Sequence, residues 1–488
     1  MGFLHTAKWY LRDIIELRNI LRLKKELIRN QKLPHEGLKN LQDQKFRDVL
    51  KYAMAHSPFY REFYKGIDPE RCSIEDLPIL TKRIMMDNYD SLVTDPRLNL
   101  KDLEEFLSDR ANAAMPFKDD FVILNSSGTS GEMGIMAYHW GEFDYAYATG
   151  MARGNSFPTS LLSLFGYIIG ERLRVANIMM TNGHAASFIT CYRISMNPNN
   201  PIMDNRFFSV FKPIDELCDE LNKFQPHILQ AYSTVITNLA YEQLAGRLKL
   251  RFDDPRSVIA SLSEPLSSKT RELCKEAFGR DVIDDYGACE SILMARECEM
   301  HRGMHINSDL VILEVVDENY QPVPPGTTGN KILVTNLYTY VQPIIRYELQ
   351  DRVCMEPESC TCGSTLPLIR SVEGRTDEIV WISKPGGGYE PIHPYIFFVP
   401  TLNNPGIKEY QAEQIERDKV IFRIVPVEPG SMTDDDVTRM VEKSLEEEGL
   451  GGRMKIEGKA VDSIQRDPVS GKILQVISRV GPPEGVRE

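Results

Sequence analysis

Residues 125–134 of this chain read Asn125-Ser126-Ser127-Gly128-Thr129-Ser130-Gly131-Glu132-Met133-Gly134. The apolar run before them, residues 121–124, predicts a strand. Glycine permits positive φ and a close approach of the backbone to a ligand, and successive N–H groups and hydroxyls can surround phosphate oxygens. A strand that enters such a loop is a phosphate-binding arrangement. Taken alone, the segment fits an ordinary Gly/Ser turn equally well.

Two common nucleotide-binding motifs are excluded at this loop. A Walker A motif ends in Gly-Lys-Ser/Thr, and no lysine follows these glycines. The spacing is not Gly-x-Gly-x-x-Gly either. Other segments must therefore decide what the loop binds.

Length and composition limit the class of protein. At 488 residues the chain is too long for one core, so we expect two or more domains. A net charge of −13 argues against nucleic-acid binding as the main role. The chain has no run of about 18 apolar residues, so we expect no transmembrane helix, and its N-terminus lacks a signal-peptide core. Nine cysteines without a secretory signal indicate reduced thiols and a cytoplasmic location.

The first part of the chain predicts helices. Residues 7–30 carry apolar side chains among basic ones at helical spacing, and residues 44–64 form a second helical stretch. We favour packing of the first helix onto the main body over a membrane-surface or partner-binding role.

Short apolar strands then alternate with amphipathic helices to about residue 370, which predicts an α/β core with much parallel sheet. The expected strands include residues 173–179, 228–230, 257–261, 282–284 and 310–316, and the expected helices include 214–224, 234–246 and 267–278.

The chain changes character at residues 374–384. After them the pattern predicts a small α+β unit, with a helix at residues 433–447 and strands at 420–425, near 455–456 and at 473–477. We therefore expect a large N-terminal α/β domain with parallel and mixed sheets, residues 1–375, which includes a helical segment, residues 1–65. A hinge would join it to a small mobile C-terminal α+β domain, residues 376–488.

A second segment with chemistry in it is Asp284-Asp285-Tyr286-Gly287-Ala288-Cys289-Glu290, which follows an expected strand. Ligands of open α/β sheets bind at the carboxyl ends of the strands. A tyrosine there can stack on a purine, and the carboxylate of Glu290 can hold Mg²⁺ next to phosphate oxygens. Taken alone, this heptapeptide is better explained as a surface turn.

Four other segments carry the polar groups that a nucleotide site needs. They are Ser263-Glu264-Pro265-Leu266, Arg346-Tyr347-Glu348-Leu349-Gln350-Asp351, Gly374-Arg375-Thr376-Asp377 and Arg466-Asp467-Pro468-Val469-Ser470-Gly471-Lys472. With the two segments above, they resemble the ordered signature motifs of adenylate-forming enzymes, the superfamily of acyl-CoA synthetases and nonribosomal adenylation domains. The resemblance covers residues 125–472.

This resemblance implies an ATP site built from several segments. Residues Asp285, Tyr286 and Gly287 would bind ATP, with Tyr286 able to stack on the purine, and Asp351 would accept hydrogen bonds from both ribose hydroxyls. The remaining ATP-binding residues would be Ser126, Ser127, Gly128, Thr129, Ser130, Gly131, Ser263, Glu264, Pro265 and Arg375. An exposed ion pair is the alternative for Asp351.

The resemblance also implies the catalytic groups. Lys472 would reach the carboxylate of the substrate and the α-phosphate, Thr129 would contact the phosphates, and Glu290 would hold Mg²⁺. Asp377 would be the hinge on which the small domain rotates between the two half-reactions. Two departures from the family stand out, namely Ala288-Cys289 before Glu290 and Glu132-Met133 where a lysine is common. A solvated lysine beside a turn is the alternative for Lys472.

Two N-terminal segments resemble one branch of the superfamily, the phenylacetate–CoA ligases and their capsule-biosynthesis-associated relatives. They are Ser57-Pro58-Phe59-Tyr60-Arg61 and Leu77-Pro78-Ile79-Leu80-Thr81-Lys82. The branch implies an AMP-forming acid–thiol ligase that converts a carboxylic acid, by default an aromatic one, to an acyl-adenylate and then to an acyl-CoA. Because residues 384–394 differ from typical phenylacetate ligases, an amine or a carrier-protein thiol is an alternative acceptor. A non-catalytic nucleotide-binding relative is a further alternative, although Lys472, Glu290 and Asp351 are all retained.

The cysteines suggest a metal site. Cys298, His305, Cys360 and Cys362 supply three thiolates and one imidazole, which suit a tetrahedral, structural Zn²⁺. Some members of the branch carry such a zinc. His301 is a rival for His305, and free buried thiols are the alternative to a metal.

His184 and Tyr232 lie in segments where we expect the wall of the acyl pocket, and Tyr286 and Gly287 would also face the acid. Plain core or turn positions explain His184 and Tyr232 as well. The sequence leaves the acid and the oligomeric state open, a homodimer being one option.

Overall fold

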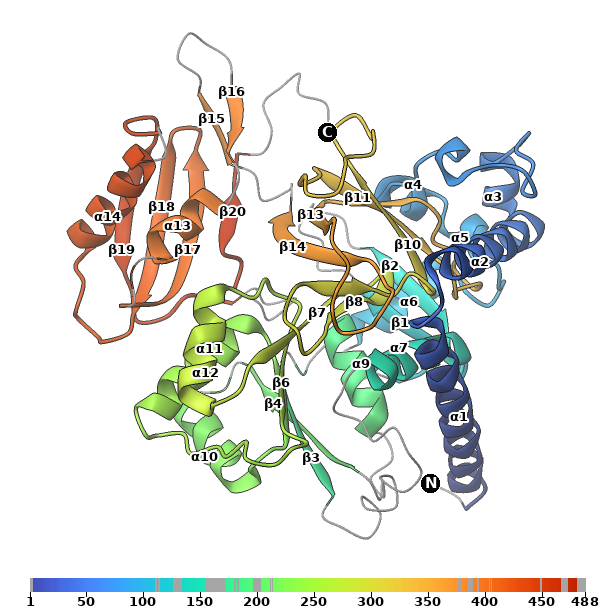
Figure 1. The fold of residues 1–488 in the computed structure, drawn as a ribbon, viewed down its shortest axis with the longest axis horizontal. Helices are drawn as coiled ribbons and strands as arrows, with labels where there is room; N and C mark the ends of the chain where they lie inside the picture. Colours follow the sequence, from blue (N-terminus) through green and yellow to red (C-terminus); the bar gives the residue numbers. More distant parts are fainter. Residues whose placement is uncertain are drawn as a thin grey trace.

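The structure, a computed structural model, describes residues 3–109, 112, 115–125, 134–153, 172–179, 181, 184–195, 203–210, 212, 214–375, 380–383, 389–392, 395–402, 404, 406–447, 450–466 and 473–480. These residues form two bodies (Figure 1), and the main hydrophobic core of each lies on one side of residues 376–379. The larger core runs from Leu23 to Ile369 and the smaller one from Val380 to Val476. The predicted α/β fold class is confirmed, whereas the boundary at residue 375 stays a proposal.

A nine-stranded mixed sheet forms the centre of the large body. Its strands are β3 (Leu173–Met179), β4 (Met203–Ser209), β5 (Ile228–Ala231), β6 (Val258–Leu262), β7 (Val282–Ala288), β8 (Ser291–Glu297), β9 (Met304–Ile306), β13 (Asp351–Glu356) and β14 (Leu368–Arg375). Their order is β13-β14-β9-β8-β7-β6-β5-β3-β4. Pairing is parallel from β4 to β7 and antiparallel from β7 to β13. β7 is thus the strand at which the sheet changes its mode of pairing.

Helices of the large body follow the predicted amphipathic pattern. They include α7 (Trp140–Arg153), α9 (Ala186–Ser195), α10 (Ile214–Phe224), α11 (Ser233–Leu244) and α12 (Ser268–Phe278). In α10, Leu217, Leu221 and Phe224 recur at helical spacing and are buried, which explains the amphipathic face. At the start of α12 the hydroxyl of Ser267 accepts the N–H of Thr270 at 3.0 Å and caps the helix.

A smaller antiparallel sheet and a hairpin complete the large body. The sheet consists of β10 (Val311–Val316), β11 (Lys331–Asn336) and β12 (Tyr347–Leu349), and the hairpin of β1 (Phe121–Asn125) and β2 (Ile135–His139). Asn125 pairs with Ile135, so the hairpin brings together the two ends of the Ser/Thr/Gly loop. The carboxylate of Glu142 accepts the N–H groups of His139, Tyr340 and Val341 and ties the hairpin to its neighbours; burial raises the pKa of Glu142 to about 7.

The N-terminal segment is helical. It contains α1 (Phe3–Asn30), α2 (His35–His56), α3 (Pro58–Phe63), a 3-10 turn at Ile74–Asp76, α4 (Lys82–Asp87), α5 (Tyr89–Leu92) and α6 (Leu100–Ser108). The helical stretch predicted over residues 44–64 consists of the end of α2 and of α3, since Pro58 starts a new helix and the hydroxyl of Ser57 accepts the N–H of Tyr60 at 3.2 Å. Among the described helices, none combines the length and the apolar character that crossing a bilayer demands.

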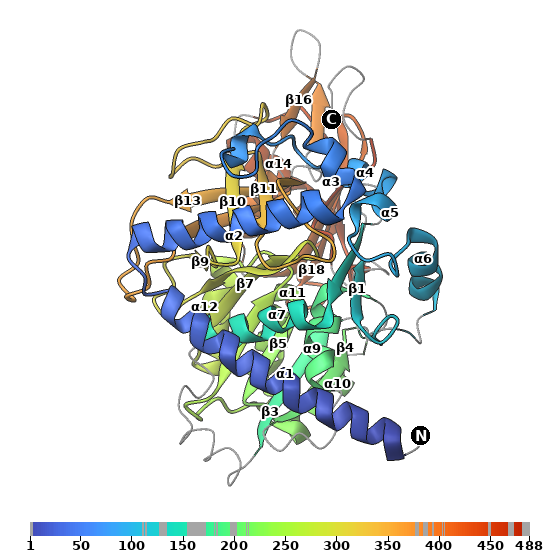
Figure 2. The same cartoon turned by 90° about the vertical axis from the view of Figure 1, so that its right-hand side faces the viewer.

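Helix α1 packs along α7, as predicted for the first helix (Figure 2). Two buried arginines anchor it. Arg153 ion-pairs with Asp309 at 2.7 Å, with 4% and 0% of the two side chains exposed, and also donates to the carbonyl of Leu27 in α1. Arg193 pairs with Asp144 at 2.9 Å and with Glu16 of α1 at 3.1 Å. Removing one member of such a buried pair leaves an uncompensated charge, so these contacts fix where α1 lies.

The small body is an α+β unit. It contains β15 (Val380–Ser383), β16 (Tyr389–Ile392), α13 (Tyr395–Leu402), β17 (Ile407–Glu416), β18 (Lys419–Pro426), α14 (Asp434–Glu447), β19 (Lys455–Ala460) and β20 (Val476–Ser478). Its four-stranded sheet has the order β19-β18-β17-β20. The strands near β18, β19 and β20 and helix α14 were predicted. β17 was not, because polar side chains such as Gln411 and Gln414 occupy buried positions along it.

Candidate active site

The sequence suggested that the segment Asp285-Tyr286-Gly287 follows a strand. In the structure the segment lies within strand β7. β7 and β8 form a tight hairpin in which Ala288 pairs with Ser291, so that Glu290 occupies the turn with only 4% of its surface exposed. A Cβ on Gly287 would lie 2.6 Å from the backbone nitrogen of Leu293 in β8. Glycine is therefore required here by the hairpin itself, in addition to any approach of a ligand.

Tyr286 and Asp351 meet although they are far apart in the sequence. The hydroxyl of Tyr286 donates to Oδ2 of Asp351 at 2.7 Å. Asp351 opens β13, and its backbone pairs with Arg375 at the end of β14. The predicted ATP-binding residues Tyr286, Asp351 and Arg375 thus come from three strands and lie near the end of β7, at the start of β13 and at the end of β14. The side chain of Arg375 lies outside what is described.

Asp285 of β7 forms an ion pair with Arg296 of β8. The carboxylate and the guanidinium are 3.4 Å apart, with 13% and 10% of the two side chains exposed, and burial raises the pKa of Asp285. Burial also raises the pKa of the neighbouring Asp284 to about 7. The described contacts of Asp285 therefore hold β7 to β8, and its predicted role toward ATP stays a prediction.

The end of β1 lies against the β7–β8 turn. Asn125 donates its N–H to the carbonyl of His184 at 3.1 Å, and the thiol of Cys289 lies 3.3 Å from the carbonyl oxygen of Asn125. His184 is buried beside Phe106, with ring centroids 5.5 Å apart, and burial lowers its pKa. The structure thus brings His184, Glu290 and the entrance of the Ser/Thr/Gly loop into one neighbourhood.

The ends of β5 and β6 complete this edge of the sheet. Tyr232 directly follows β5 and is fully buried. Ser263 follows β6 in a left-handed conformation with φ of 66°, which turns the chain toward Glu264 and Pro265. Glu264 accepts the N–H of Thr234 at 2.9 Å and so links the two strand ends.

Several predicted residues lie outside the described part of the chain. They are Ser126, Ser127, Gly128, Thr129, Ser130, Gly131, Asp377 and Lys472. His227, which begins the segment that ends in Tyr232 and Ser233, precedes β5 at the opposite edge of the sheet, where its Nδ1 accepts the N–H of Arg174 at 3.0 Å. It is not brought to the other residues.

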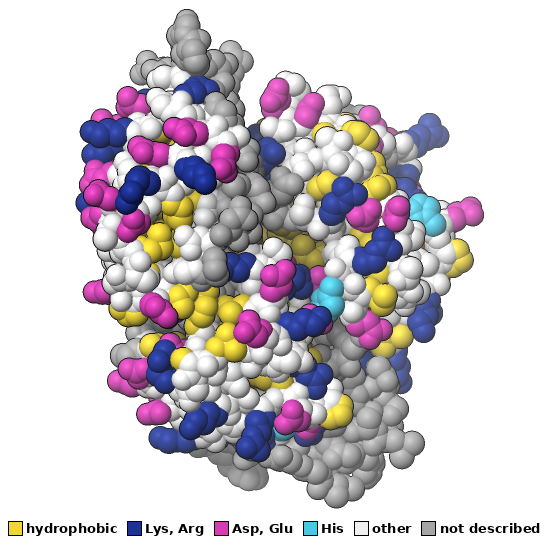
Figure 3. Space-filling model, turned by 60° about the vertical axis from the view of Figure 1, so that its left-hand side comes forward, with side chains coloured by type: hydrophobic (Ala, Val, Ile, Leu, Met, Phe, Trp, Pro, Cys, Tyr) yellow, Lys and Arg dark blue, Asp and Glu magenta, His cyan; other side chains and the backbone are white. Residues whose placement is uncertain are grey.

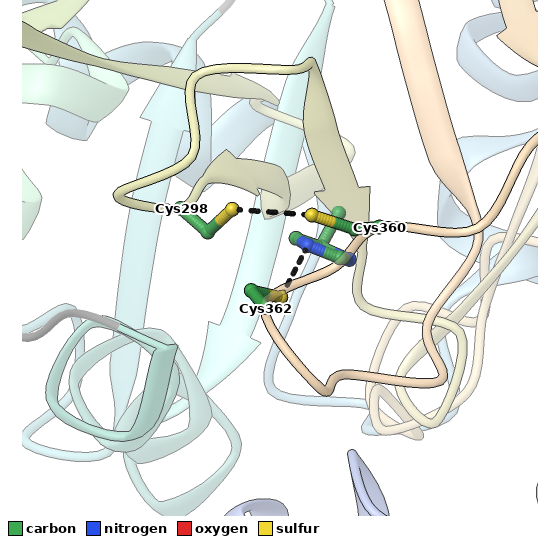
Figure 4. A group of neighbouring side chains, drawn as sticks. Cys298, Cys360 and Cys362 are labelled. Carbon is green, nitrogen blue, oxygen red and sulfur yellow. Dashed lines mark hydrogen bonds between the residues drawn. The ribbon is translucent and has the colours of Figure 1, made fainter.

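The four predicted zinc ligands come together. The ligand atoms of Cys298, His305, Cys360 and Cys362 all lie within 4.8 Å of one another. The three thiols converge in Figure 4, with Cys298 and Cys360 joined by a contact of 3.7 Å. A disulfide needs about 2.05 Å between sulfurs. Two thiolates on one tetrahedral zinc at about 2.3 Å would lie about 3.8 Å apart, which fits the observed spacing.

The orientation of His305 also fits a metal ligand. Its Nδ1 lies 3.1 Å from the carbonyl oxygen of Leu366, while its Nε2 lies 3.3 Å from the sulfur of Cys362. A metal-bound histidine commonly donates its other ring N–H to a carbonyl in this way. The rival His301 instead ion-pairs with Glu297 at 3.2 Å, outside the cluster.

The cluster of these four side chains connects two strand hairpins. Cys298 and His305 come from the β8–β9 connection and β9, and both other cysteines come from the loop between β13 and β14. Gly303 lies between the two, where a Cβ would be 2.3 Å from the carbonyl oxygen of Ile369. Because β9 and β14 pair through only Leu368–His305 and Ile369–Met304, a bound metal would reinforce a short ladder. A zinc ion held by these four side chains would have no open coordination position, as in structural zinc sites.

Sequence reasoning missed the residues that join the two bodies. Lys269 and Asn238 of the large body contact residues of the β17 region, and Arg466 contacts Thr234. None of these belongs to a recognisable pattern, since each contact joins residues more than a hundred positions apart.

Known proteins resemble this chain in sequence and in fold. No family profile matches the chain. A phenylacetate–coenzyme A ligase from Thermus thermophilus is 25% identical over 367 residues, which are 72% of this chain and 73% of that protein. The protein CapK from Staphylococcus aureus is 23% identical over 65% of this chain and 63% of its own length.

A solved structure of 2-hydroxyisobutyryl-CoA ligase in the postadenylation state matches with a TM-score of 0.68 at 19% identity, over 91% of this chain and 90% of that one. The same ligase in its thioesterification state gives a TM-score of 0.56 over similar lengths. In sequence, in fold and in the order of its motifs, the chain is therefore similar to adenylate-forming ligases of the phenylacetate–CoA ligase type.

Proposed function

We propose that this enzyme, an AMP-forming acid–thiol ligase, activates an aromatic carboxylic acid with ATP and transfers the acyl group to coenzyme A. The observation that carries the proposal is the meeting of Tyr286, Asp351 and the Arg375 backbone beside the ends of β5 and β6. The phenylacetate–coenzyme A ligase of Thermus thermophilus supports the choice of an aromatic acid and of the acceptor.

The chemistry needs positioning and charge stabilisation. A carboxylate oxygen of the acid attacks the α-phosphorus of ATP, the bond to the β-phosphate oxygen breaks, and pyrophosphate leaves. The thiol sulfur of coenzyme A then attacks the acyl carbon, the thiol gives up its proton, and AMP leaves. The acid is already ionised at neutral pH, so the first step needs no general base. The residues supply in-line geometry and countercharge, with Lys472 as the mobile cation.

Two metals belong to this proposal. The buried carboxylate of Glu290 would hold Mg²⁺, which takes one or two carboxylates together with phosphate oxygens and would neutralise charge on the phosphates. The Cys298, His305, Cys360 and Cys362 set would hold a structural Zn²⁺.

The setting of the enzyme is also proposed. None of the nine cysteines, all of which lie in the described residues, forms a disulfide, which supports a reducing compartment and hence the cytoplasm. A carrier-protein thiol is the alternative acceptor, and transfer to purified carrier proteins in place of coenzyme A distinguishes the two.

The test of the function is ATP–pyrophosphate exchange with a panel of acids that begins with phenylacetate, benzoates and amino acids. We expect exchange that depends on one aromatic acid, followed by thioester formation when coenzyme A is added. If none of the acids supported exchange although ATP bound measurably, the non-catalytic alternative would be favoured.

The Tyr286–Asp351 contact yields a prediction about ribose recognition. In Tyr286→Phe the ring is kept and the O–H is lost, so the carboxylate of Asp351 loses the group that aims it. Hydrogen bonds to charged groups contribute about 1.5–3 kcal/mol, so we expect the KM for ATP to rise about tenfold. The wild-type enzyme should prefer ATP over 2′-deoxy-ATP, and the variant should lose most of that preference. Equal weakening for both nucleotides would instead indicate a general packing role for the hydroxyl.

A further inference from the structure

The large and small bodies are joined by hydrogen bonds from helices α11 and α12. Figure 3 views the face on which the two bodies meet, with a notch between them at the top of the view. In the described residues, Lys269 of α12 donates to the carbonyl oxygens of Asn404 at 3.0 Å and Ile407 at 2.8 Å. Asn238 of α11 donates to the carboxylate of Glu409 in β17.

Lys269 stands in a position that helix stability does not explain. It is the second residue of α12, where a cation is unfavourable because the helix dipole is positive at that end. Its ammonium group is partly buried, and this burial lowers its pKa. The two carbonyls of the small body are the contacts that offset these costs.

Hydrogen bonds within the small body hold the turn whose carbonyl groups accept from Lys269. The Asn404 side chain accepts the N–H of Gly406 at 3.0 Å, and its backbone carbonyl accepts the N–H of Ile407 at 3.3 Å. The turn connects α13 to β17, so it moves with the core of the small body. A bond from Lys269 to this turn therefore fixes a whole domain and not a loose loop.

A second contact leads from the same interface toward the nucleotide residues. Arg466 of the small body donates to the hydroxyl of Thr234 at 3.4 Å, and the N–H of Thr234 donates to Glu264. Arg466 precedes the segment that carries Lys472. Ile473 follows that segment and is buried against Val425 and Ile464 of the small body. The position of the small body thus sets where both ends of the Lys472 segment are anchored.

We propose that Lys269 is a positioning residue for the acid-activation half-reaction, which holds the small domain in the arrangement described here. The inference rests on the proposed function. It is supported by the better match of this chain to the postadenylation state of 2-hydroxyisobutyryl-CoA ligase than to its thioesterification state, with TM-scores of 0.68 and 0.56. Because Lys269 acts only in one arrangement, it should matter to one half-reaction and not to the other.

The test compares Lys269→Met with Lys275→Met. Both lysines lie on α12, but Lys275 is exposed and pairs only weakly with Asp281 of its own body at 3.4 Å. We expect Lys269→Met to lower kcat for ATP–pyrophosphate exchange about tenfold with little change in KM, because fewer molecules occupy the competent arrangement. Thioester formation from added acyl-adenylate and coenzyme A should stay at the wild-type rate or rise. Lys275→Met should change neither rate, and Lys269→Arg, which keeps the donors, should restore part of the exchange.

Three outcomes would overturn the inference. They are unchanged exchange in Lys269→Met, an equal loss in both half-reactions, and a loss in Lys275→Met as large as in Lys269→Met. Thermal unfolding of each variant shows whether a loss reflects misfolding, and Asn238→Ala gives a second variant of the same interface with the same expected direction. Absence of exchange in the wild-type enzyme would refute the proposed function itself and is seen before any variant is made.

Discussion

Replacing Lys472 by alanine is expected to lower ATP–pyrophosphate exchange by a factor of about 10²–10³ while ATP still binds. The lysine would place a full positive charge where negative charge develops as pyrophosphate leaves, and removing one such preorganised group costs about that factor in rate. Exchange kinetics with the preferred acid, together with ATP binding by calorimetry, measure the two effects separately.

A matched control comes from the same domain. Lys459 is also a lysine of the small body, but it pairs on the surface with Asp434 at 3.2 Å. Lys459→Ala should keep the exchange rate near the wild-type value. If Lys472→Ala exchanged as fast as Lys459→Ala, another group would have to supply the charge, and the non-catalytic alternative would gain weight.

The second large effect concerns the metal centre. Protein purified without added metal should contain one zinc per chain, and Cys360→Ser should lose it. Since a structural zinc contributes directly to folding, we expect the midpoint of thermal unfolding to fall by roughly 5–10 °C. Metal analysis and calorimetry of both proteins check the two parts of the prediction.

Cys72→Ala is the control for this prediction, because Cys72 is a free thiol outside the cluster. It should keep the zinc and the unfolding temperature. A wild-type protein without zinc, in which the thiols of Cys298, Cys360 and Cys362 all react with a thiol reagent, would contradict the metal assignment.

Local pattern predicted much of the fold. Helix α10 and strand β3 were predicted with the bounds that the structure shows, because their apolar residues recur at one clear period. The long strand β17 had no such signal. Its buried Gln414 donates to the carbonyl oxygen of Trp381, 33 residues away, and a buried amide that is satisfied by a distant partner looks like a surface residue in the sequence.

The candidate site was predictable as a set of segments but not as a geometry. Motif order identified Tyr286 and Asp351, yet only the folded structure shows that Asp351, the first residue of β13, accepts a hydrogen bond from Tyr286 of β7. The spacing of Cys298 and Cys360 is equally uninformative, because the antiparallel half of the sheet and not the sequence interval sets their distance. The contacts of Lys269 depend on how two bodies are placed, which no local pattern encodes.

Helix α1 has a consequence for any shortened form of this enzyme. A chain that began after residue 31 would strip Arg153 of the Leu27 carbonyl, Asp309 of the Asn30 amide and Arg193 of the Glu16 carboxylate. The two guanidinium groups would lose acceptors, and breaking one buried ion pair costs about 3–5 kcal/mol. The N-terminal helix is thus part of the folding unit of the large body, and its removal by a protease would act as a destabilising lesion and not as the trimming of a tail.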